Sequence, residues 1–271
     1  MNKIPATKYS IEDLLYLMKR LRDPETGCPW DLKQTYQSIA SHTLEEVYEV
    51  VDAIERGDLE HLSEELGDLL FQIIFYSQLG KEQGRFDFEQ ITTTITEKLL
   101  RRHPHVFPDG TLESIRDSDT GDVEDIKQAW ESLKKRERAG KGEIKVLDDI
   151  PIALPALSRA TKLQKRAASV GFDWPTTAGV MGKVKEEIEE LEVEISLGNS
   201  DGIAEELGDL LFSCVNLARH LEVNPETAMR AANTKFKRRF DKVEALAGGA
   251  EIQKLSANEL ELLWDKVKQS E

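Results

Sequence analysis

The chain has 271 residues, of which 39% are hydrophobic and 32% charged, and its formal net charge is −15. This length supports one or two hydrophobic cores and favours two domains. The negative charge argues against a broad nucleic-acid-binding face, and no stretch approaches the roughly 18 consecutive apolar residues of a transmembrane helix. The amino terminus lacks the apolar segment of a signal peptide, and Cys28 and Cys214 lie far apart without metal-binding spacing. We therefore expect a cytoplasmic protein with no nucleic-acid or membrane partner.

Apolar residues recur at helical spacing through most of the sequence, and alternating strand patterns are absent. Ser10 and Asp13 form a capping pattern before the first helix, and Pro104 follows the fourth. Ser256 and Glu259 form a similar capping box before the last helix. We expect an all-α protein. The predicted helices cover residues 11–22, 39–55, 59–83, about 88–102, 123–138 (a charged helix) and 257–269, with a loop at 25–31.

An internal repeat relates the two halves of the chain. The segment from Gly67 to Phe71 recurs 141 residues later, and the alignment pairs Lys19-Arg20 with Lys165-Arg166 and Trp30 with Trp174. A long period with an interrupted middle favours a duplicated four-helix domain over a solenoid of short units. The predicted domains are residues 1–107 and 151–271, joined by a linker at 108–150 that contains the charged helix.

Each half contains four carboxylates placed symmetrically about a glycine. Glu49 and Glu65 lie eight residues either side of Gly57, and Glu46 and Asp68 lie eleven residues either side of it. If the glycine marks the turn between antiparallel helices, the two i,i+3 acidic pairs face each other roughly 12 Å from the turn. The second half repeats this pattern about Gly198, with the four carboxylates Glu187, Glu190, Glu206 and Asp209.

Four converging carboxylates repel one another unless a cation is bound. The alternative is a solvent-exposed acidic face, but the helix that contains Glu65 is apolar over most of its circumference. We therefore expect Asp68 to be buried or nearly so, with no Lys or Arg opposite it in the acidic stripe. A carboxylate set without Cys or His favours Mg²⁺, with Mn²⁺ as an alternative, and disfavours zinc. His42, one turn before Glu46, is expected outside the ligand set, and its counterpart is Lys183.

Mg²⁺ held by carboxylates usually keeps water ligands and contacts substrate phosphates, which indicates phosphoryl chemistry. Basic residues follow each acidic hairpin by one helix and could contact phosphate oxygens, although basic helix ends also occur without a ligand. They are Lys98, Arg101 and Arg102 in the first half, and Lys235, Arg238 and Arg239 in the second. Three tryptophans could stack on a base or serve as packing residues: Trp30, Trp174 and Trp264.

Several motifs resemble those of the MazG nucleoside triphosphate pyrophosphohydrolase family, a member of the all-α NTP pyrophosphatase superfamily. They are RLRDPETGCPWD (20–31), HTLEEVYEVVDAI (42–54), EELGDLLFQIIFYSQ (64–78), GRFDF, RRHPHVF, LPALSRATKLQKRA (154–167), VGFDW and the second acidic hairpin. Together they span nearly the whole chain. The resemblance implies Mg²⁺-dependent hydrolysis of NTPs and dNTPs, ATP included, to NMP and pyrophosphate. It also implies broad base tolerance and a homodimer whose helices complete the sites.

The resemblance also implies roles for individual residues. Nucleotide contacts would come from Lys134, Lys183, Glu186, Glu187, Lys235, Arg239 and Trp264. The metal ligands would be Glu187, Glu190, Glu206 and Asp209, with Glu46, Glu49, Glu65 and Asp68 as a duplicate set. Gly202 stands where some family members have a lysine, and the amino-terminal half is not catalytic in every member. We expect catalysis at the carboxy-terminal quartet.

In the expected reaction, water bound to the metal attacks the α-phosphorus. A carboxylate takes the proton, either Glu186 or one of the ligands such as Glu187 and Glu190, and Lys235 and Arg239 stabilise the departing phosphates. The residues alone leave two other classes of protein open. A di-iron carboxylate protein would need Glu-x-x-His pairs that are absent from these positions. A non-catalytic helical interaction module would bind no metal at the hairpins.

Overall fold

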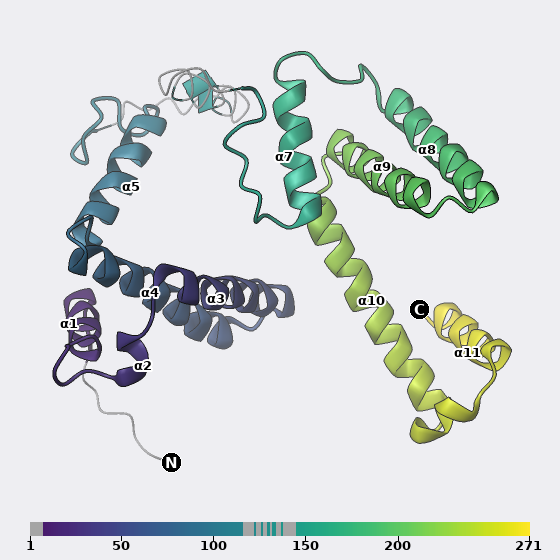
Figure 1. Cartoon of the computed structure of the whole chain (residues 1–271), viewed down its shortest axis with the longest axis horizontal. Coiled ribbons are helices and arrows are strands. Elements are labelled where there is room, and N and C mark those ends of the chain that lie inside the picture. The colour runs from purple at the N-terminus through teal and green to yellow at the C-terminus, as the bar shows by residue number, and fades with distance from the viewer. Residues whose placement is uncertain are drawn as a thin grey trace. The chain divides into compact units, whose positions relative to one another are not determined.

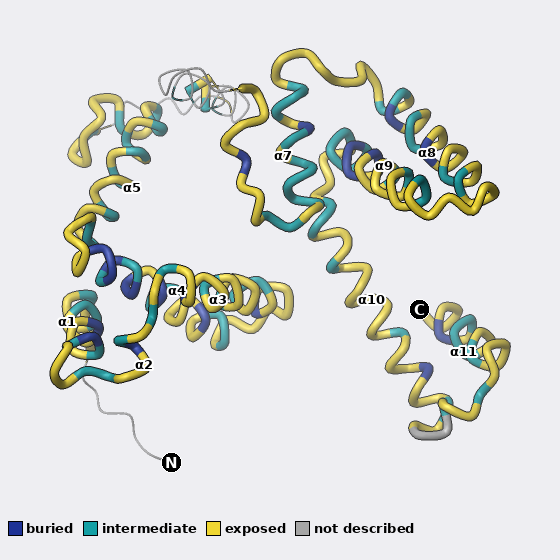
Figure 2. Tube along the Cα trace, viewed as in Figure 1, coloured by how far each residue is buried: buried dark blue, intermediate teal, exposed yellow. Residues whose placement is uncertain are grey.

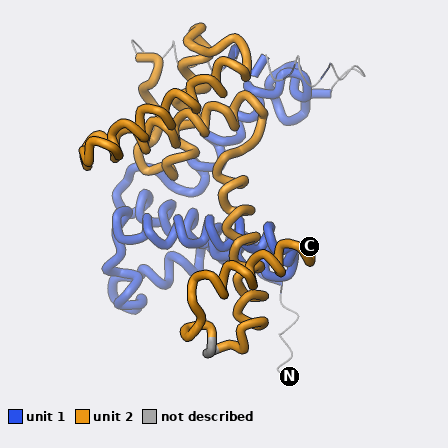
Figure 3. Tube along the Cα trace, turned by 90° about the vertical axis from the view of Figure 1, so that its right-hand side faces the viewer, with its two compact units in different colours: residues 1–136 blue, residues 137–271 orange. Residues whose placement is uncertain are grey.

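The computed structural model describes residues 8–115 and 145–271, together with positions 122, 126, 129–130, 132–133 and 137 between them. Every regular element in the described residues is a helix, which confirms the all-α prediction, and none of these helices is long and apolar enough to cross a membrane. The chain divides into two compact units, residues 1–136 and 137–271 (Figure 3). This division falls within the linker predicted at 108–150. Most of the charged helix predicted at 123–138, including Lys134, lies outside the described residues.

Unit 1 contains a long helical hairpin flanked by shorter helices (Figure 1). The third of its helices begins three residues before the predicted start, because Thr35 and Ser38 form a capping box there. A short helix replaces part of the predicted loop at 25–31, with Pro29 at its first position, where a missing N–H is tolerated. Its helices are α1 (Ile11–Leu21), α2 (Pro29–Leu32), α3 (Tyr36–Arg56), α4 (Leu59–Glu82) and α5 (Phe88–Arg102).

The core of unit 1 lies where α1 and α3 pack against α4. Met18 of α1 and Ile39 of α3 join Ile74, Phe75 and Leu79 of α4 in one buried cluster, and Met18 and Ile74 have no exposed surface. Full burial of a large apolar side chain stabilises the folded state by about 1.5–3 kcal/mol. This cluster therefore fixes the hairpin against α1.

Unit 2 repeats the hairpin and adds a helical extension. The hairpin is formed by α8 and α9, α7 packs against α9, and α10 begins beside α7 and leads to α11, which folds back onto it (Figure 1). The last helix has the predicted bounds and the predicted Ser256/Glu259 capping box. The helices are α7 (Ala156–Ala168), α8 (Thr177–Leu197), α9 (Ser200–His220), α10 (Pro225–Leu246), the 3₁₀ helix η1 (Gly249–Lys254) and α11 (Ala257–Gln269).

Both hairpins turn at the glycine about which their carboxylates are symmetric. Gly57 ends α3 with a φ of 70°, and Gly198 ends α8 with a φ of 66°. A side chain with a Cβ avoids this left-handed region, so glycine is favoured at both positions. Asp58 and Asn199 follow, and the side chain of each caps the next helix. The predicted turn positions are confirmed.

Candidate metal centres

The second hairpin brings three of its four carboxylates together. Oxygen atoms of Glu187, Glu190 and Glu206 lie within 4.8 Å of one another. Carboxylate oxygens this close together suit a divalent cation, which would offset their mutual repulsion. Glu187 is only 4% exposed, whereas Glu190 is open to solvent. The cluster could therefore hold a metal ion with a side that substrate can reach.

The first hairpin forms an equivalent cluster. Oxygen atoms of Glu46, Glu49 and Glu65 also lie within 4.8 Å of one another. Here the buried carboxylate is Glu65, 7% exposed, which lies on the second helix of the hairpin rather than on the first. Gln72 donates a hydrogen bond from Nε2 to Glu46 Oε1 at 3.4 Å. His42 lies outside this group, with its Nδ1 3.6 Å from a carboxylate oxygen of Glu45.

The fourth carboxylate of each predicted quartet stands outside its cluster. Asp68 and Asp209 are both exposed, so the expectation of a buried Asp68 is wrong. The apolar side of α4 that was expected to be covered is open within one chain, as shown by Leu66, which is 49% exposed. Burial first and then the Asp68 charge raise the pKa of Glu46. Burial also raises the pKa of Glu206, followed by neighbouring carboxylates that include Asp209. Both aspartates are therefore close enough to act on their clusters.

Lys183 supplies a cation to the second cluster. Its ammonium nitrogen lies 2.8 Å from an oxygen of Glu186, 2.8 Å from one of Glu187 and 3.8 Å from one of Glu190. Lys183 precedes Glu187 by one turn of α8, the position that His42 has before Glu46. Hydrogen bonds to Glu186 and then Glu187 raise the pKa of Lys183 above its usual value, so the ammonium stays charged at neutral pH.

In the first cluster, the side chain that contacts the buried carboxylate is His61. Its Nε2 lies 2.9 Å from a Glu65 oxygen, and its Nδ1 lies 3.6 Å from one of Glu64. The i,i+4 spacing of His61 and Glu65 is the spacing of Lys183 and Glu187, and the sequence contains it. Comparison of the two halves hides this likeness, because His61 aligns with Gly202 instead of with Lys183. Sequence reasoning therefore missed His61.

The basic residues of α10 contact α11. Arg239 Nε lies 2.9 Å from a carboxylate oxygen of Glu271, and its guanidinium lies 5.9 Å from the centroid of the Trp264 ring. Phe236 packs against the same ring, with the centroids 5.3 Å apart. Lys235 is exposed on α10. Among the described residues, Lys235, Arg239 and Trp264 make no contact with the three clustered carboxylates of the second hairpin. Their roles at a nucleotide therefore stay predictions.

The fold and these clusters define a class of protein. Across the described residues, two copies of an antiparallel helical hairpin each bring three carboxylates together, which makes this a duplicated all-α protein with two candidate metal centres. Residues 34–107 and 176–244 match the MazG nucleotide pyrophosphohydrolase domain, so each match contains one hairpin. The chain belongs to the MazG family.

Full-length relatives agree with this assignment. The chain is 50% identical over 265 residues to the nucleoside triphosphate pyrophosphohydrolase of Escherichia coli strain K12, which covers 96% of this chain and 98% of that protein. It is 40% identical over 259 residues to the nucleoside triphosphate pyrophosphohydrolase/pyrophosphatase MazG of Thermotoga maritima, with 95% of each chain covered. The resemblance inferred from the motifs is confirmed. The di-iron and non-catalytic alternatives lose their support.

Proposed function

We propose that this chain hydrolyses nucleoside triphosphates to nucleoside monophosphates and pyrophosphate. The observation that supports this most directly is the convergence of Glu187, Glu190 and Glu206 within 4.8 Å, in a chain that matches the MazG domain twice. The two full-length relatives are named as nucleoside triphosphate pyrophosphohydrolases, which supports the same substrate class.

The proposed metal is Mg²⁺, with Mn²⁺ able to replace it. Carboxylate oxygens are the ligands that these ions prefer, and neither cluster includes a Cys or His ligand within the described residues. A bound Mg²⁺ would lower the pKa of a water molecule and neutralise charge on the triphosphate. The proposed catalytic ligands are Glu187, Glu190, Glu206 and Asp209, and the duplicate set in unit 1 is Glu46, Glu49, Glu65 and Asp68.

The residues around the cluster would position the substrate and move the proton. The water oxygen would form a bond to the α-phosphorus while the bond between the α-phosphorus and the bridging oxygen breaks, so that this oxygen leaves with pyrophosphate. Glu186 would accept the proton of the water, because Lys183 holds its carboxylate at 2.8 Å beside the metal ligands. Lys183 would then be placed to contact phosphate oxygens, and Lys235 and Arg239 would stabilise the charge on the leaving pyrophosphate.

A product-resolved assay in water labelled with oxygen-18 tests this reaction. The expected products are NMP and pyrophosphate, with the label in NMP, because the water attacks the α-phosphorus. Label in pyrophosphate would place the attack at the β-phosphorus. Orthophosphate and NDP as products would overturn the proposed reaction altogether. A panel of NTPs and dNTPs in the same assay measures how broadly the bases are tolerated.

We also propose that the chain forms a homodimer. Much of α9 is exposed within unit 2 (Figure 2). Its exposed side chains include apolar ones, because Leu207, Leu211 and Phe212 are 46%, 49% and 43% exposed. Clustered apolar exposure of this kind marks protein interfaces. Light scattering should give twice the chain mass. Leu211→Glu should shift the protein to monomers, whereas Leu112→Glu, the same substitution at an exposed leucine outside the hairpins, should not. A monomeric wild type would contradict the proposal.

A further inference from the structure

The helical extension of unit 2 contains a dense group of basic side chains. The only acidic residue between positions 235 and 242 of α10 is Asp241, which pairs with one of them at 2.8 Å. The segment is therefore strongly positive in a chain whose formal net charge is −15. Its basic residues are Lys235, Lys237, Arg238, Arg239 and Lys242.

One carboxylate receives three of these cations. Glu271 accepts a hydrogen bond from Arg239 Nε at 2.9 Å. It also accepts hydrogen bonds from Arg238 Nη2 at 2.9 Å and from Lys242 Nζ at 3.3 Å. The hydrogen bond from Arg239 is the main cause that lowers the pKa of Glu271, so the carboxylate is charged at neutral pH. Three cations around one anion leave two positive charges in excess, so the group still attracts an anion.

Apolar packing holds α11 against α10 without help from this carboxylate. Val243 of α10 and Val267 of α11 are each 2% exposed, and the rings of Phe236 and Trp264 lie 5.3 Å apart. Burial of apolar surface is the dominant force that packs helices together, whereas exposed ion pairs contribute little. Attachment of α11 therefore does not explain why three cations converge on Glu271.

Two contacts fix the orientation of the Arg239 guanidinium. Glu271 accepts from its Nε, and its plane lies over the Trp264 ring, 5.9 Å from the centroid. Among the described residues, neither contact involves the two terminal amino groups. A guanidinium is planar and has five N–H donors in a fixed fork, so holding Nε and one face also sets the directions of the other four N–H bonds. Arg239 is thus oriented in advance for an anion.

The same pair of residues recurs after the first hairpin. Trp130 precedes Glu137 by seven residues, as Trp264 precedes Glu271. Trp130 Nε1 donates a hydrogen bond to the backbone oxygen of Arg102 at 2.7 Å, and this arginine is the counterpart of the one beside Trp264. A tryptophan thus lies at the equivalent arginine in both units. The recurrence indicates that the Trp-Glu spacing belongs to the duplicated unit.

We propose that Glu271 is a positioning residue for the leaving group, an inference that rests on the proposed function. It holds Arg239 through Nε against the face of Trp264, so that the terminal amino groups are presented to the departing pyrophosphate. Because the guanidinium is already oriented, little side-chain freedom is lost when the phosphates bind. It neutralises charge on the leaving group as the bond to the α-phosphorus breaks. Arg238 and Lys242 neutralise Glu271, which limits its repulsion of the phosphates.

Two substitutions at Glu271 separate position from charge. Glu271→Ala should lower kcat for NTP hydrolysis by about tenfold and change KM by less than about threefold, because the charge develops in the transition state. Glu271→Gln keeps an oxygen that accepts from Arg239 Nε and should retain kcat within about threefold. Glu261→Ala, the same substitution on the exposed side of α11, should change neither value.

Two results of this experiment would overturn the proposal. A lower KM in Glu271→Ala would show that the carboxylate competes with the phosphates for Arg239. Equal losses of kcat in Glu271→Ala and Glu271→Gln would show that the charge matters and the position does not.

A double-mutant cycle shows whether Glu271 acts through Arg239. Arg239→Ala should lower kcat more than Glu271→Ala, and the double variant should be no slower than Arg239→Ala alone. Losses that multiply would overturn the positioning role, because they would show that Glu271 acts separately, as it would if it only supported the fold of α11.

The basicity of the leaving group gives a readout that a purely structural role would not change. NTP analogues with CH₂ or CF₂ in place of the β,γ-bridging oxygen release bisphosphonates, of which the CF₂ form is the weaker base. Loss of positive charge at the leaving group should slow the CH₂ analogue more, so the CF₂/CH₂ ratio of kcat should rise about threefold in Glu271→Ala and not in Glu261→Ala. An unchanged ratio overturns the positioning role, and continued release of NMP and pyrophosphate from NTPs leaves the proposed reaction standing.

Discussion

The two acidic hairpins share the same backbone arrangement, but their buried carboxylates lie on opposite helices of the hairpin. In unit 1 the buried group is Glu65 on α4, beside His61, and in unit 2 it is Glu187 on α8, beside Lys183. In both, the nitrogen-bearing side chain that contacts the buried carboxylate precedes it by four residues on the same helix. A buried carboxylate needs a compensating charge, and either helix of a hairpin can supply it. The duplication has therefore kept the positions of the carboxylates and changed the charges around them.

The surroundings of the hairpin are also more polar in unit 2 than in unit 1. Lysine is charged throughout the physiological pH range, whereas a histidine side chain is charged only when protonated. Unit 2 also has the polar residues Gln164 and Asn216 at positions where unit 1 has Met18 and Phe75 in its apolar core. Unit 1 thus has a tightly packed core at the place where two buried amide side chains line a mostly apolar cavity of unit 2, between α7, α9 and the loop before α8. This contrast favours catalysis in unit 2, and the predictions below test it.

The largest expected effect comes from removing one carboxylate at matched positions of the two hairpins. Glu190→Ala should lower kcat/KM for NTP hydrolysis by at least about 100-fold, because it removes a metal ligand at the proposed catalytic centre. Glu49→Ala, the equivalent change in unit 1, should retain activity within about threefold of the wild type, as expected if unit 2 alone is catalytic. The reverse result would place catalysis in unit 1, and equal losses would show that both clusters are required.

A stability measurement tests the contrast between core and cavity. Met18→Gln introduces into unit 1 the amide that unit 2 has, where no partner is available, and should lower the free energy of unfolding by about 1–3 kcal/mol in urea titrations. Met18→Leu serves as the control, since a volume-conserving apolar change usually costs less than about 1.5 kcal/mol. Equal costs for the two variants would mean that this core tolerates a polar group, which would remove the basis of the comparison.

Removing the cation of unit 2 should have a moderate effect. Lys183→Met frees Glu187 and Glu190 from a competing positive charge, so Mn²⁺ should bind roughly 2- to 10-fold more tightly without nucleotide, as measured by electron paramagnetic resonance. The KM for NTPs should rise, because a phosphate contact is lost. His61→Met makes the matched change at Glu65 and should alter Mn²⁺ binding at unit 1 only. Weaker Mn²⁺ binding in Lys183→Met would show that the lysine supports the site instead of competing for it.

The sequence predicted the parts of this structure that depend on local pattern. Helical periodicity, the capping residues and the left-handed glycines Gly57 and Gly198 fix the hairpins, and the hairpins bring three carboxylates of each quartet together. Asp68 was placed wrongly, because its burial depends on what covers the apolar side of α4, and local pattern does not specify that. Gln164 was missed for a related reason. Its burial depends on residues of α9 and the loop before α8, which tertiary packing brings together.

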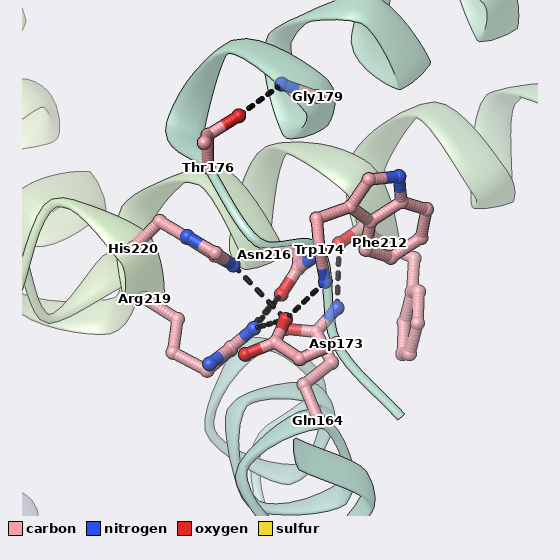
Figure 4. A network of polar contacts seen from close by, with 9 residues as sticks. All are labelled: Gln164, Asp173, Trp174, Thr176, Gly179, Phe212, Asn216, Arg219 and His220. Atoms are coloured by element: carbon pink, nitrogen blue, oxygen red, sulfur yellow. Dashed lines mark hydrogen bonds and ion pairs between the residues drawn. The ribbon is translucent and has the colours of Figure 1, made fainter. Parts of the chain in front are cut away.

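The smallest expected effect concerns an ion pair that both units contain. The basic and acidic residues of this pair have exchanged places between the two units. In unit 1, Arg22 after α1 pairs with Glu82 at the end of α4, at 2.7 Å, whereas in unit 2 Asp173 after α7 pairs with Arg219 on α9 (Figure 4). A hydrogen bond from Arg219 is the main cause that lowers the pKa of Asp173 to about 2. Asp173→Asn should therefore lower the stability of unit 2 by about 1 kcal/mol or less at pH 7, since the pair is partly exposed.

The pH dependence gives this last prediction its sign. Because the folded-state pKa of Asp173 is below its ordinary value, the pair contributes its full stability above about pH 4 and loses it as the pH falls towards 2. The difference in Tm between the wild type and Asp173→Asn should thus narrow between pH 4 and 3. Glu82→Gln should behave in the same way in unit 1, because its partner Arg22 lowers the pKa of that carboxyl against the opposing effect of burial. A difference that does not narrow over this range would show that folding does not lower the pKa of Asp173.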